Sequence, residues 1–480
     1  MQEFKNFIGG EWVNSSNGAT FESRNPANPD EIVGVFPLAT QADTRRAIEA
    51  ARTALPGWAN TPPPDRGAIL QRASQIVAAR LDDLAALLTR EEGKTLAEAR
   101  AEMVRTRDIF HYYGGEGWRV GGDVLPSTVP GELLYTKREA LGVISVITPW
   151  NFPIAIPAWK IAPALVYGNT VVFKPASYTP RIGLMLVEVL VEAGLPPGVI
   201  NFVTGSGQTV GDEMAGNPGV NGLTFTGSYQ VGSHIYAQAL PNMTRVQLEM
   251  GGKNPLIVLN DARLDQAVNL AVKGGFGVTG QACTASSRVI VEEGIANDFA
   301  QALAQAARHL VVGDGLDQQT HMGPAVSQEQ LETDLNYVKI GQTEGAKLLA
   351  GGGLVKEGGF YVQPTVFDQV EPQMRIAQEE IFGPVIGIIR ARDLDDAIEK
   401  ANGIGFGLSA GIVTNDLQKA FTFANRIEAG VVKINEPTSG IGPHAPFGGF
   451  KHSSANTFKE QGPAAVEFYT RTKTIYVGHG

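Results

Sequence analysis

The stretches 142–148 (GVISVIT) and 169–175 (NTVVFKP) decide the fold class of this chain. Each is a short run of β-branched and apolar residues beside glycine, asparagine or proline, which is typical of strands buried on both faces. The same pattern recurs at 198–205 (GVINFVTG), 222–227 (GLTFTG) and 245–250 (RVQLEM). Helical stretches, such as 180–194 and 229–240, separate these strands. Strands joined by helices of this length form right-handed crossovers, so we predict a parallel sheet.

A second series of strands and helices follows. The strands are expected at 254–259 (NPLIVL), 286–293 (SSRVIVEE), 383–390 (GPVIGIIR) and 408–415 (LSAGIVTN). Helical periodicity separates them at 264–278, 295–310, 394–402 and 416–427. The chain therefore belongs to the α/β class, with two Rossmann-like parallel-sheet domains.

Other segments surround the two series. Residues 41–58 and 64–110 have helical periodicity and predict an N-terminal helical layer. The segments 121–140 and 462–480 look extended and fit neither series. We predict that they form a small β arm, a candidate for pairing with another subunit.

Composition excludes several classes of function. The chain has 480 residues, 43% hydrophobic and 18% charged, with a formal net charge of −10. Because its lysines and arginines are scattered, we expect no nucleic-acid partner. We find no leader and no apolar run long enough for a membrane span, so we expect a cytoplasmic protein without a membrane partner. The chain lacks HExxH and CxxC patterns, and we expect no metal site.

Two short motifs fail in context. Residues 91–95 (EEGKT) end like a phosphate-binding loop, but that motif needs glycine at position 88, which is Leu88 inside an expected helix. Residues 407–411 (GLSAG) fit a serine-hydrolase nucleophile motif centred on Ser409, which must follow a strand and precede a helix. Here the expected order is helix, loop, strand, so the hydrolase interpretation is weak.

Two glycine-bearing turns fit an anion better. Residues 203–211 (VTGSGQTVG) and 225–232 (FTGSYQVG) each follow an expected strand and begin a helix, where free amides can bind pyrophosphate. Lys174 lies at the end of a strand, at the edge where α/β sheets bind ligands. Taken alone, each turn could be purely structural and Lys174 a solvated lysine.

Seven stretches together are more specific than any one motif. They are TPWNFP (148–153), GNTVVFKPAS (168–177), FTGS (225–228), EMGGKNP (249–255), GQACTASSR (280–288), EEIFGPV (379–385) and PFGGFKHSS (446–454). In order and spacing they resemble the aldehyde dehydrogenase superfamily, non-phosphorylating and NAD(P)-dependent, over essentially the whole chain. The resemblance implies a cofactor-binding domain at 1–120 and 141–249, a catalytic domain at 250–450, and a homo-oligomer, dimer or tetramer.

The resemblance assigns the catalytic residues. Cys283, the only cysteine of the chain, matches the thiol that attacks the aldehyde carbon, giving a thiohemiacetal and then a thioester. Glu249 matches the general base, Asn151 the oxyanion-hole amide, and Lys160 a lysine close to the active centre. Without the resemblance, Cys283 could be packing filler, Glu249 a surface residue, Asn151 a turn residue and Lys160 a solvated lysine. An ordinary thiol is mostly protonated at pH 7, so we expect activation by a helix N-terminus or a base.

The resemblance also implies an NAD(P)+ site. Its residues are Thr148, Pro149, Trp150, Lys174, Ser177, Gly207, Gly211, Phe225, Thr226, Gly227, Ser228, Glu380 and Phe382. Strictly NAD-linked relatives carry a glutamate where this chain has Ser177. Because a carboxylate there would repel a 2′-phosphate, we predict that NADP+ is accepted, with equal use of both cofactors left open.

The aldehyde is less well determined. Residues 151–177 look most like dehydrogenases of α-ketoglutaric semialdehyde (2,5-dioxopentanoate), with succinate-semialdehyde enzymes as near neighbours. The latter usually have arginine at the position of Trp159. We therefore expect a small acidic semialdehyde, with succinic semialdehyde or longer aliphatic and aromatic aldehydes as alternatives. The expected substrate-binding residues are Phe152, Trp159, Ala282, Thr284 and Arg288, although Arg288 could instead form a structural ion pair.

Three other functions stay open at this point. A thiol esterase could use Cys283 with the same oxyanion hole. A homologue could be catalytically silent, although it keeps Cys283, Glu249 and Asn151. A coenzyme-A-acylating enzyme would pass the thioester to another thiol, whereas Glu249 favours water.

Overall fold

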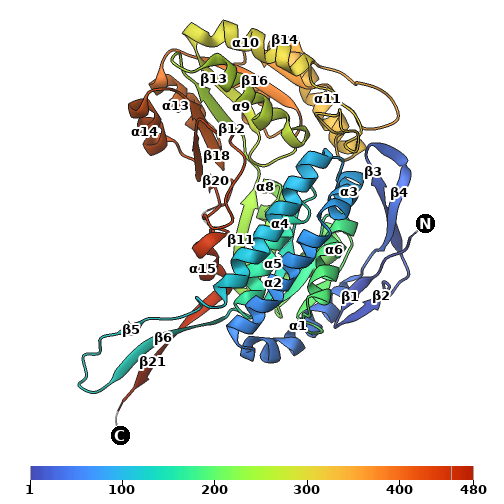
Figure 1. Cartoon of the computed structure of the whole chain (residues 1–480), viewed down its shortest axis with the longest axis vertical. Coiled ribbons are helices and arrows are strands. Elements are labelled where there is room, and N and C mark those ends of the chain that lie inside the picture. The colour runs from blue at the N-terminus through green and yellow to red at the C-terminus, as the bar shows by residue number, and fades with distance from the viewer. Residues whose placement is uncertain (1, 456, 479–480) are drawn as a thin grey trace.

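A computed structural model describes residues 2–455 and 457–478. Residues 1, 456 and 479–480, the last two of which belong to the predicted arm, lie outside it. Two α/β bodies lie one above the other, and an arm that carries the C-terminus extends from the lower body (Figure 1). The predicted α/β class with two largely parallel sheets is confirmed. The predicted domain boundaries remain a prediction.

The first sheet has the strand order β11-β10-β7-β8-β9-β1-β2. Its parallel strands are β7 (Val143–Ile147), β8 (Thr170–Lys174), β9 (Ile200–Phe202), β10 (Gly222–Gly227) and β11 (Arg245–Met250). The short β1 (Asn6–Ile8) and β2 (Glu11–Val13) extend one edge in antiparallel fashion. The chain order reverses between β7 and β10, and the carboxyl edge of a sheet at such a point is where α/β folds bind ligands.

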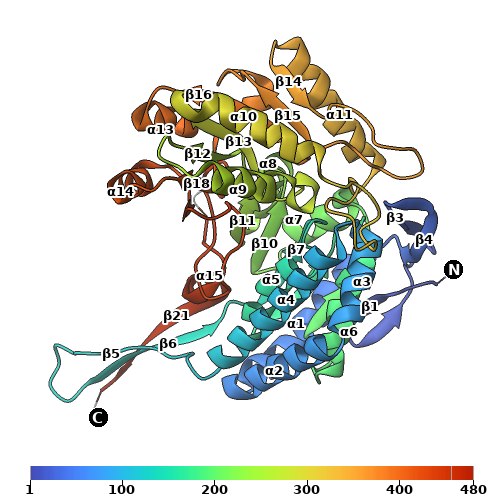
Figure 2. The same cartoon turned by 45° about the horizontal axis from the view of Figure 1, so that its top comes forward.

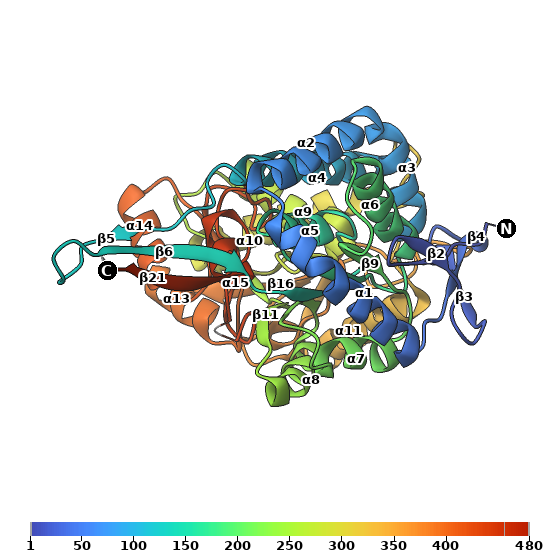
Figure 3. The same cartoon turned by 90° about the horizontal axis from the view of Figure 1, so that it is seen from below.

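Helices cover both faces of this sheet. They are α1 (Gln41–Asn60), α2 (Pro63–Ala79), α3 (Leu81–Glu92), α4 (Leu96–Glu116), α5 (Ala155–Val166), α6 (Pro180–Glu192), α7 (Asp212–Gly216) and α8 (Tyr229–Ala239). Ile144 and Val146 of β7 pack into the core with α2 to α6, whereas Val143 and Ile147 pack with α1, α7 and α8. This alternation follows from the two-residue period of a strand. Seen from below, α2, α3 and α4 lie on one side and α7 and α8 on the other (Figure 3).

The predicted helical layer is broken more often than its periodicity suggests. Residues 64–110, predicted only as a helical stretch, fall into three helices, and α4 runs on to Glu116. The second break lies at Gly93, whose φ of 100° ends α3, and at Thr95, which caps α4 by accepting a hydrogen bond from the Glu98 N–H. Leu88 lies inside α3 as expected, whereas residues 93–95 interrupt the helical stretch expected at 64–110, because glycine in this conformation ends a helix.

The second sheet has the order β14-β15-β16-β13-β12-β18-β19 and is parallel except for β14. Its strands are β12 (Asn254–Val258), β13 (Ser286–Glu292), β14 (Lys347–Ala350), β15 (Thr365–Asp368), β16 (Val385–Ala391), β18 (Ser409–Val413) and β19 (Val431–Ile434). Its helices are α9 (Leu264–Phe276), α10 (Glu293–Arg308), α11 (Gln328–Thr343), α12 (Arg375–Gln378), α13 (Leu394–Asn402) and α14 (Leu417–Arg426). The turned view shows α9 and α10 beside β12 and β13 (Figure 2), with which they form one core cluster.

Three smaller sheets complete the fold. The arm consists of β5 (Val124–Leu125), β6 (Leu133–Ala140) and β21 (Thr470–Val477), and α15 (Ala465–Tyr469) leads into it. The hairpin of β3 (Thr20–Asn25) and β4 (Asn28–Pro37) and the pair β17 (Phe406–Gly407) and β20 (Phe450–Lys451) were not predicted. Within the described residues, no helix has both the length and the apolarity to cross a bilayer.

Candidate active site

A cavity of about 440 Å³ lies where the two bodies meet. Residues from both line it: Pro149, Trp150, Asn151, Thr226, Gly227, Ser228, Gln230, Met250 and Gly251, and Cys283, Glu329, Gln330, Thr333, Glu380, Ile381 and Phe382. The first group lies at the carboxyl edge of the first sheet, beside the point where the strand order reverses. Nine of the predicted catalytic and cofactor residues, Asn151 and Cys283 among them, thus share one concave site, the usual form of a ligand pocket.

Cys283 lies in the loop between η3 (Gly277–Gly280) and β13 and faces this cavity. Burial raises the pKa of its thiol well above the usual range, and the carboxylates of Glu380 and Glu249 raise it further. The expected activation by a helix N-terminus is not found, because Cys283 precedes a strand. In this state the thiol keeps its proton at neutral pH, so a base must accept the proton when the sulfur reacts.

The backbone before Cys283 is strained. Val278 and Thr279 have φ values of 51° and 58°, in the left-handed region that β-branched residues avoid. The Val278 N–H donates to Glu98 Oε1 at 2.6 Å, and the Thr279 hydroxyl donates to the Gly323 carbonyl at 3.0 Å. Such strain persists only where surrounding bonds determine the conformation, and it clusters at functional sites.

Asn151 lies directly across from this loop. Its side chain is 2% exposed, and Nδ2 donates to the carbonyl of Gln281, two residues before Cys283, at 2.8 Å. Its Oδ1 accepts no hydrogen bond from the described residues. The amide is therefore held beside the sulfur-bearing loop with one Nδ2 hydrogen left for another acceptor.

Glu249 lies near the carboxyl end of β11 and is 2% exposed, which excludes the alternative of a surface glutamate. Its Oε1 accepts a hydrogen bond from Ser454 Oγ at 2.7 Å, and Oε2 has no partner among the described residues. Burial raises the pKa of this carboxyl to about 8, with a further contribution from Glu460. A side chain at Gly448 would collide with Oε1, since its Cβ would lie 2.5 Å away. The carboxyl thus has a proton affinity suited to a base near neutral pH.

Glu380 and Phe382 come from the second body. Glu380 Oε1 accepts the Gly252 N–H at 2.8 Å, and burial raises the pKa of this carboxyl to about 7. A Cβ at Gly251 would lie 1.8 Å from Glu380 Oε2, so only glycine admits this carboxylate. The ring of Phe382 meets Trp150 edge to face, with centroids 5.3 Å apart.

These residues fit a dinucleotide. α8 begins at the cavity: Ser228 caps it, and its first amides and dipole favour a pyrophosphate. The buried Thr226 Oγ1 has no hydrogen-bond partner among the described residues. A ribose hydroxyl could donate to the Glu380 carboxylate.

The other predicted cofactor residues lie outside the cavity lining. Lys174 is only 6% exposed, with Nζ donating to the Pro175 carbonyl at 3.2 Å, and burial lowers its pKa to about 8, so it is not a solvated lysine. Ser177 is exposed three residues further on. Thr148 and Phe225 are buried, and Phe225 belongs to the hydrophobic core. Gly207 and Gly211 lie in η1 (Gly207–Gly211), where a Cβ would meet open space, so close packing does not require glycine there.

Lys160 is fully buried in α5 and pairs with Glu460. Its Nζ also donates to Thr224 Oγ1 at 2.8 Å, and the neighbouring Trp159 donates from Nε1 to Glu460 Oε2 at 2.8 Å. Two predicted residues thus bind one carboxylate that the sequence did not single out. The indole N–H of Trp159 is therefore used within the protein, not left free for a substrate.

Arg288 requires a correction. It is fully buried, and its guanidinium donates to the carbonyls of Lys253, Lys400 and Ala401 at 3.0, 3.2 and 2.9 Å. It forms neither the expected substrate contact nor an ion pair, because backbone carbonyls bind its donors inside the second body. The remaining predicted substrate residues, Phe152, Ala282 and Thr284, lie next to the site residues in sequence but do not line the cavity.

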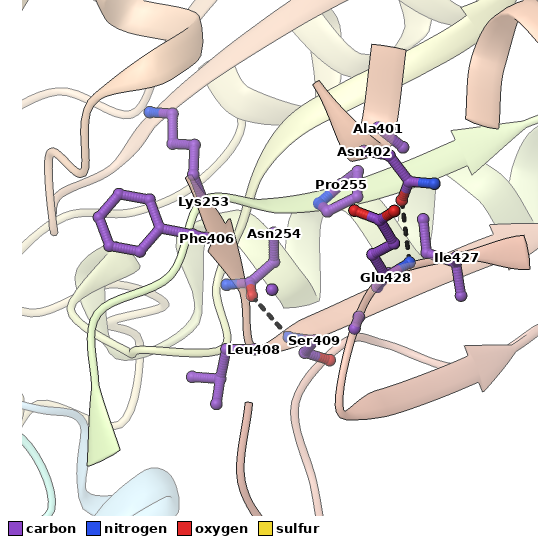
Figure 4. A pocket seen from close by; sticks show the side chains of 13 residues that line it. Lys253, Asn254, Pro255, Ala401, Asn402, Phe406, Leu408, Ser409, Ile427 and Glu428 are labelled. Carbon is purple, nitrogen blue, oxygen red and sulfur yellow. Dashed lines mark hydrogen bonds between the residues drawn. The ribbon is translucent and has the colours of Figure 1, made fainter. Parts of the chain in front are cut away.

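Ser409 faces a different environment (Figure 4). It is 1% exposed, its Oγ donates to the Thr438 carbonyl at 2.7 Å, and its N–H donates to Asn254 Oδ1 at 3.0 Å. The adjacent cavity measures only about 10 Å³, which is room for about one water molecule. A substrate cannot reach this serine, which agrees with the weak hydrolase interpretation.

The family follows from a comparison with known proteins. A model of the aldehyde dehydrogenase family matches residues 12–475. The chain belongs to the aldehyde dehydrogenase family. It is therefore an oxidoreductase that uses NAD(P)+ to oxidise an aldehyde.

Relatives in this aldehyde dehydrogenase family are similar over nearly their whole length. An α-ketoglutarate semialdehyde dehydrogenase of Haloferax volcanii is 49% identical, covering 98% of both chains. An α-ketoglutaric semialdehyde dehydrogenase of Bacillus subtilis is 48% identical, covering 99% of this chain and 98% of the relative. The crystal structure of betaine aldehyde dehydrogenase from Staphylococcus aureus in complex with NAD+ is 36% identical, with a TM-score of 0.96, covering 98% of this aldehyde dehydrogenase and 94% of that chain.

Some residues of the site escaped sequence analysis. Ser454 and Gly448, which contact Glu249, lie within the stretch 446–454 that carried the resemblance, so a signal for them was present. Glu460 lies in an unremarkable segment near the C-terminus. Gln281 contributes a backbone carbonyl, which no side-chain pattern reveals. In the described part of the chain there is no cluster of three or more potential metal ligands.

Proposed function

We propose that this aldehyde dehydrogenase oxidises a small acidic semialdehyde, 2,5-dioxopentanoate, to the corresponding dicarboxylic acid. The names of the two relatives that are nearly half identical to it support this choice. One observation supports the chemistry most directly. Cys283 and Asn151 line one cavity, and Asn151 Nδ2 donates to the Gln281 carbonyl of the Cys283 loop at 2.8 Å.

In the proposed first step the Cys283 sulfur attacks the aldehyde carbon. Ionised Glu249 accepts the thiol proton, directly or through water, as the carbon–sulfur bond forms and the carbonyl π electrons move onto the oxygen. The Asn151 amide and the Cys283 backbone N–H then bind the resulting alkoxide. An oxyanion donor of this kind contributes about 2.7–4 kcal/mol to transition-state stabilisation.

Bound NAD(P)+ supplies the hydride acceptor for the oxidation. Its nicotinamide ribose would be held by Glu380, its ring would lie near Phe382, and its pyrophosphate would lie at the beginning of α8. Cys283 then carries a thioester. After the thiol proton has passed from Glu249 to solvent, the ionised carboxylate removes a proton from a water molecule that attacks this thioester. The carbon–sulfur bond then breaks, the acid leaves, and the proton on Glu249 returns to the Cys283 sulfur.

We also propose that NADP+ is accepted. Ser177 is exposed three residues after Lys174, and a hydroxyl can donate a hydrogen bond to a 2′-phosphate that a carboxylate would repel. The ammonium of Lys174 supplies positive charge at the end of β8.

Initial rates test the substrate proposal. The panel comprises 2,5-dioxopentanoate, succinic semialdehyde, glutaraldehyde, hexanal and benzaldehyde, each with NAD+ and NADP+. We expect the highest kcat/KM for 2,5-dioxopentanoate. A neutral aldehyde that exceeds both acids by more than about tenfold, or about 1.4 kcal/mol of transition-state preference, contradicts the proposal.

The arm supports a proposal on assembly. β21 forms an edge of the arm sheet, and the arm exposes apolar side chains, including Val124 (77%) and Tyr476 (64%). An open edge with apolar residues favours pairing with another chain. We propose a homo-oligomer in the cytoplasm, where reducing conditions keep the single thiol active. Sedimentation equilibrium that gives the mass of one chain would contradict the oligomer.

A further inference from the structure

The corner between α3 and α4 contains a cluster of buried charges behind the active site. This corner comprises residues 92–102, including the end of the EEGKT stretch that resembled a phosphate loop. The side chains of Lys94, Glu92 and Glu102 are all completely buried. Lysine and glutamate are almost never buried so fully unless they are paired.

Lys94 and Glu102 bind the backbone that carries Asn151. Lys94 Nζ donates to the Asn151 carbonyl and to Glu102 Oε2, both at 2.6 Å. Glu102 Oε1 accepts the N–H groups of Ile154 and Ala155, both at 3.1 Å. The pair therefore fixes the chain from 151 to 155 at three points, and these include the residue with the oxyanion-binding amide.

Glu98, on the same corner, binds the opposite loop. Its Oε1 accepts the N–H of the strained Val278 at 2.6 Å, five residues before Cys283. Its Oε2 accepts the N–H and hydroxyl of Thr95, both at 2.9 Å, which anchors the carboxylate to the first turn of α4. One rigid corner thus contacts both backbones that meet at the Asn151–Gln281 hydrogen bond.

The cluster holds one lysine against two glutamates, and burial raises the pKa of Glu92 to about 8, so this carboxyl is largely protonated at neutral pH and Lys94 balances Glu102. Although burial alone would lower the pKa of Lys94, the neighbouring Glu102 carboxylate, and Glu92 when it is ionised, keep it above its usual value. A buried ion pair does not by itself explain the stability of a fold, since apolar residues of similar volume often stabilise the folded state equally well. What apolar residues could not provide is a donor to the Asn151 carbonyl and an acceptor for two backbone amides.

We propose that Lys94, Glu98 and Glu102 are positioning residues that set the distance and orientation between the Asn151 amide and the Cys283 loop. The inference rests on the proposed thiol mechanism, in which this amide binds the alkoxide. Displacement of a catalytic group by about 1 Å can cost about 100-fold in rate. The corner therefore acts on kcat through Asn151 without touching the substrate.

A double-mutant cycle between Lys94→Met and Asn151→Ala tests the proposal in the full-length enzyme. We expect Lys94→Met to lower kcat by about 100-fold, with KM for the aldehyde changed by less than about threefold. In the Asn151→Ala background the same change should lower kcat by less than about threefold, because the amide it positions is absent. Equal losses in both backgrounds, or no loss in the parent background, would overturn the proposal.

Lys400→Met is the matched control. Lys400 Nζ also donates to a carboxylate and a backbone carbonyl, those of Asp396 and Arg390, both at 2.8 Å, but it lies outside the cavity lining. We expect Lys400→Met to have a lower thermal unfolding temperature and a kcat within about twofold of the parent.

If Lys94→Met does not fold, the cycle is run with Lys94→Met/Glu102→Gln, which removes both charges. A parent enzyme inactive on every aldehyde overturns the proposed function, whereas an active parent with additive losses overturns only the role of the corner.

Discussion

Residues 280–288 and 407–411 are both stretches of small residues that lead into a strand, β13 and β18, and each contains a potential nucleophile. Cys283 opens onto a cavity of about 440 Å³ that is also lined by the Asn151 amide and the Glu380 carboxyl, and Glu249 is close enough to raise the pKa of its thiol. Ser409 borders a cavity of about 10 Å³ and donates to a backbone carbonyl. Asn254 joins the two stretches, since Nδ2 donates to the Cys283 carbonyl at 2.8 Å and Oδ1 accepts the Ser409 N–H. Neighbouring sites of similar composition thus differ because only one has space, a donor and a base.

The largest expected effect comes from removing the thiol. Cys283→Ala should lower aldehyde oxidation more than about 10⁴-fold, because a thiol is a far stronger nucleophile than the hydroxyls of Thr226, Ser228 and Thr333 that also line the cavity. Ester hydrolysis should fall with it. Initial rates of NAD(P)H formation and of p-nitrophenyl acetate cleavage check both. Ester hydrolysis that survives in Cys283→Ala would show that another residue is the nucleophile for esters, with Ser409 the first candidate.

Glu249→Gln removes the base near the Cys283 sulfur and so tests whether this base distinguishes the Cys283 site from the Ser409 site. We expect kcat to fall by about 100-fold or more, the typical share of a general base. Burial raises the pKa of Glu249 to about 8, and the base acts ionised, so parent kcat should rise with pH up to about 8 and then level off. The variant should lose this rise. A pH–rate profile of kcat from pH 6 to 9 measures this rise. If the rise is unchanged in Glu249→Gln, Glu249 is not the group whose ionisation causes it.

Ser177→Glu tests whether the cavity beside Cys283 extends toward the end of β8. A carboxylate there should lower kcat/KM for NADP+ by about tenfold or more through charge repulsion, while kcat/KM for NAD+ stays equal or rises. Ser177→Ala is the control, since it adds no charge. Equal losses for both cofactors in Ser177→Glu would contradict a 2′-phosphate site at this position.

The smallest effect is expected for Ser409→Ala. Aldehyde oxidation and ester hydrolysis should stay within about twofold of the parent, because this hydroxyl faces no substrate space. Loss of its hydrogen bond to Thr438 should cost about 1 kcal/mol of unfolding free energy. Urea denaturation measures this cost. A large loss of activity at unchanged stability would remove the distinction between the Cys283 and Ser409 sites.

The sequence was sufficient to predict structural features that repeat along the chain and site residues that lie within one short motif. Alternating strands and helices predicted both sheets, and the local motifs around Cys283 and Asn151 directed attention to residues that share the cavity. The break at Gly93 was missed, because helical periodicity continues on both sides of it and only the φ of 100° ends α3.

Partners that are distant in sequence could not be predicted. Arg288 was expected to bind a substrate acid or to form a structural ion pair, yet its acceptors are carbonyls that include those of Lys400 and Ala401, more than a hundred residues away. Lys160 and Trp159 share Glu460, three hundred residues further on. Backbone carbonyls have no sequence signature, and single carboxylates are too common to pair without a fold.

The division of the site between two sheets has a consequence for the newly made chain. Domains emerge from the ribosome and generally fold as units, N-terminal first. Asn151 and Glu249 belong to the first sheet body, whereas Cys283 follows in the second, and Ser454 and Glu460 are translated near the very end. The nascent enzyme therefore carries its amide and carboxyl before it has a thiol, so a chain that has not yet reached residue 283 cannot form a thiohemiacetal with cellular aldehydes.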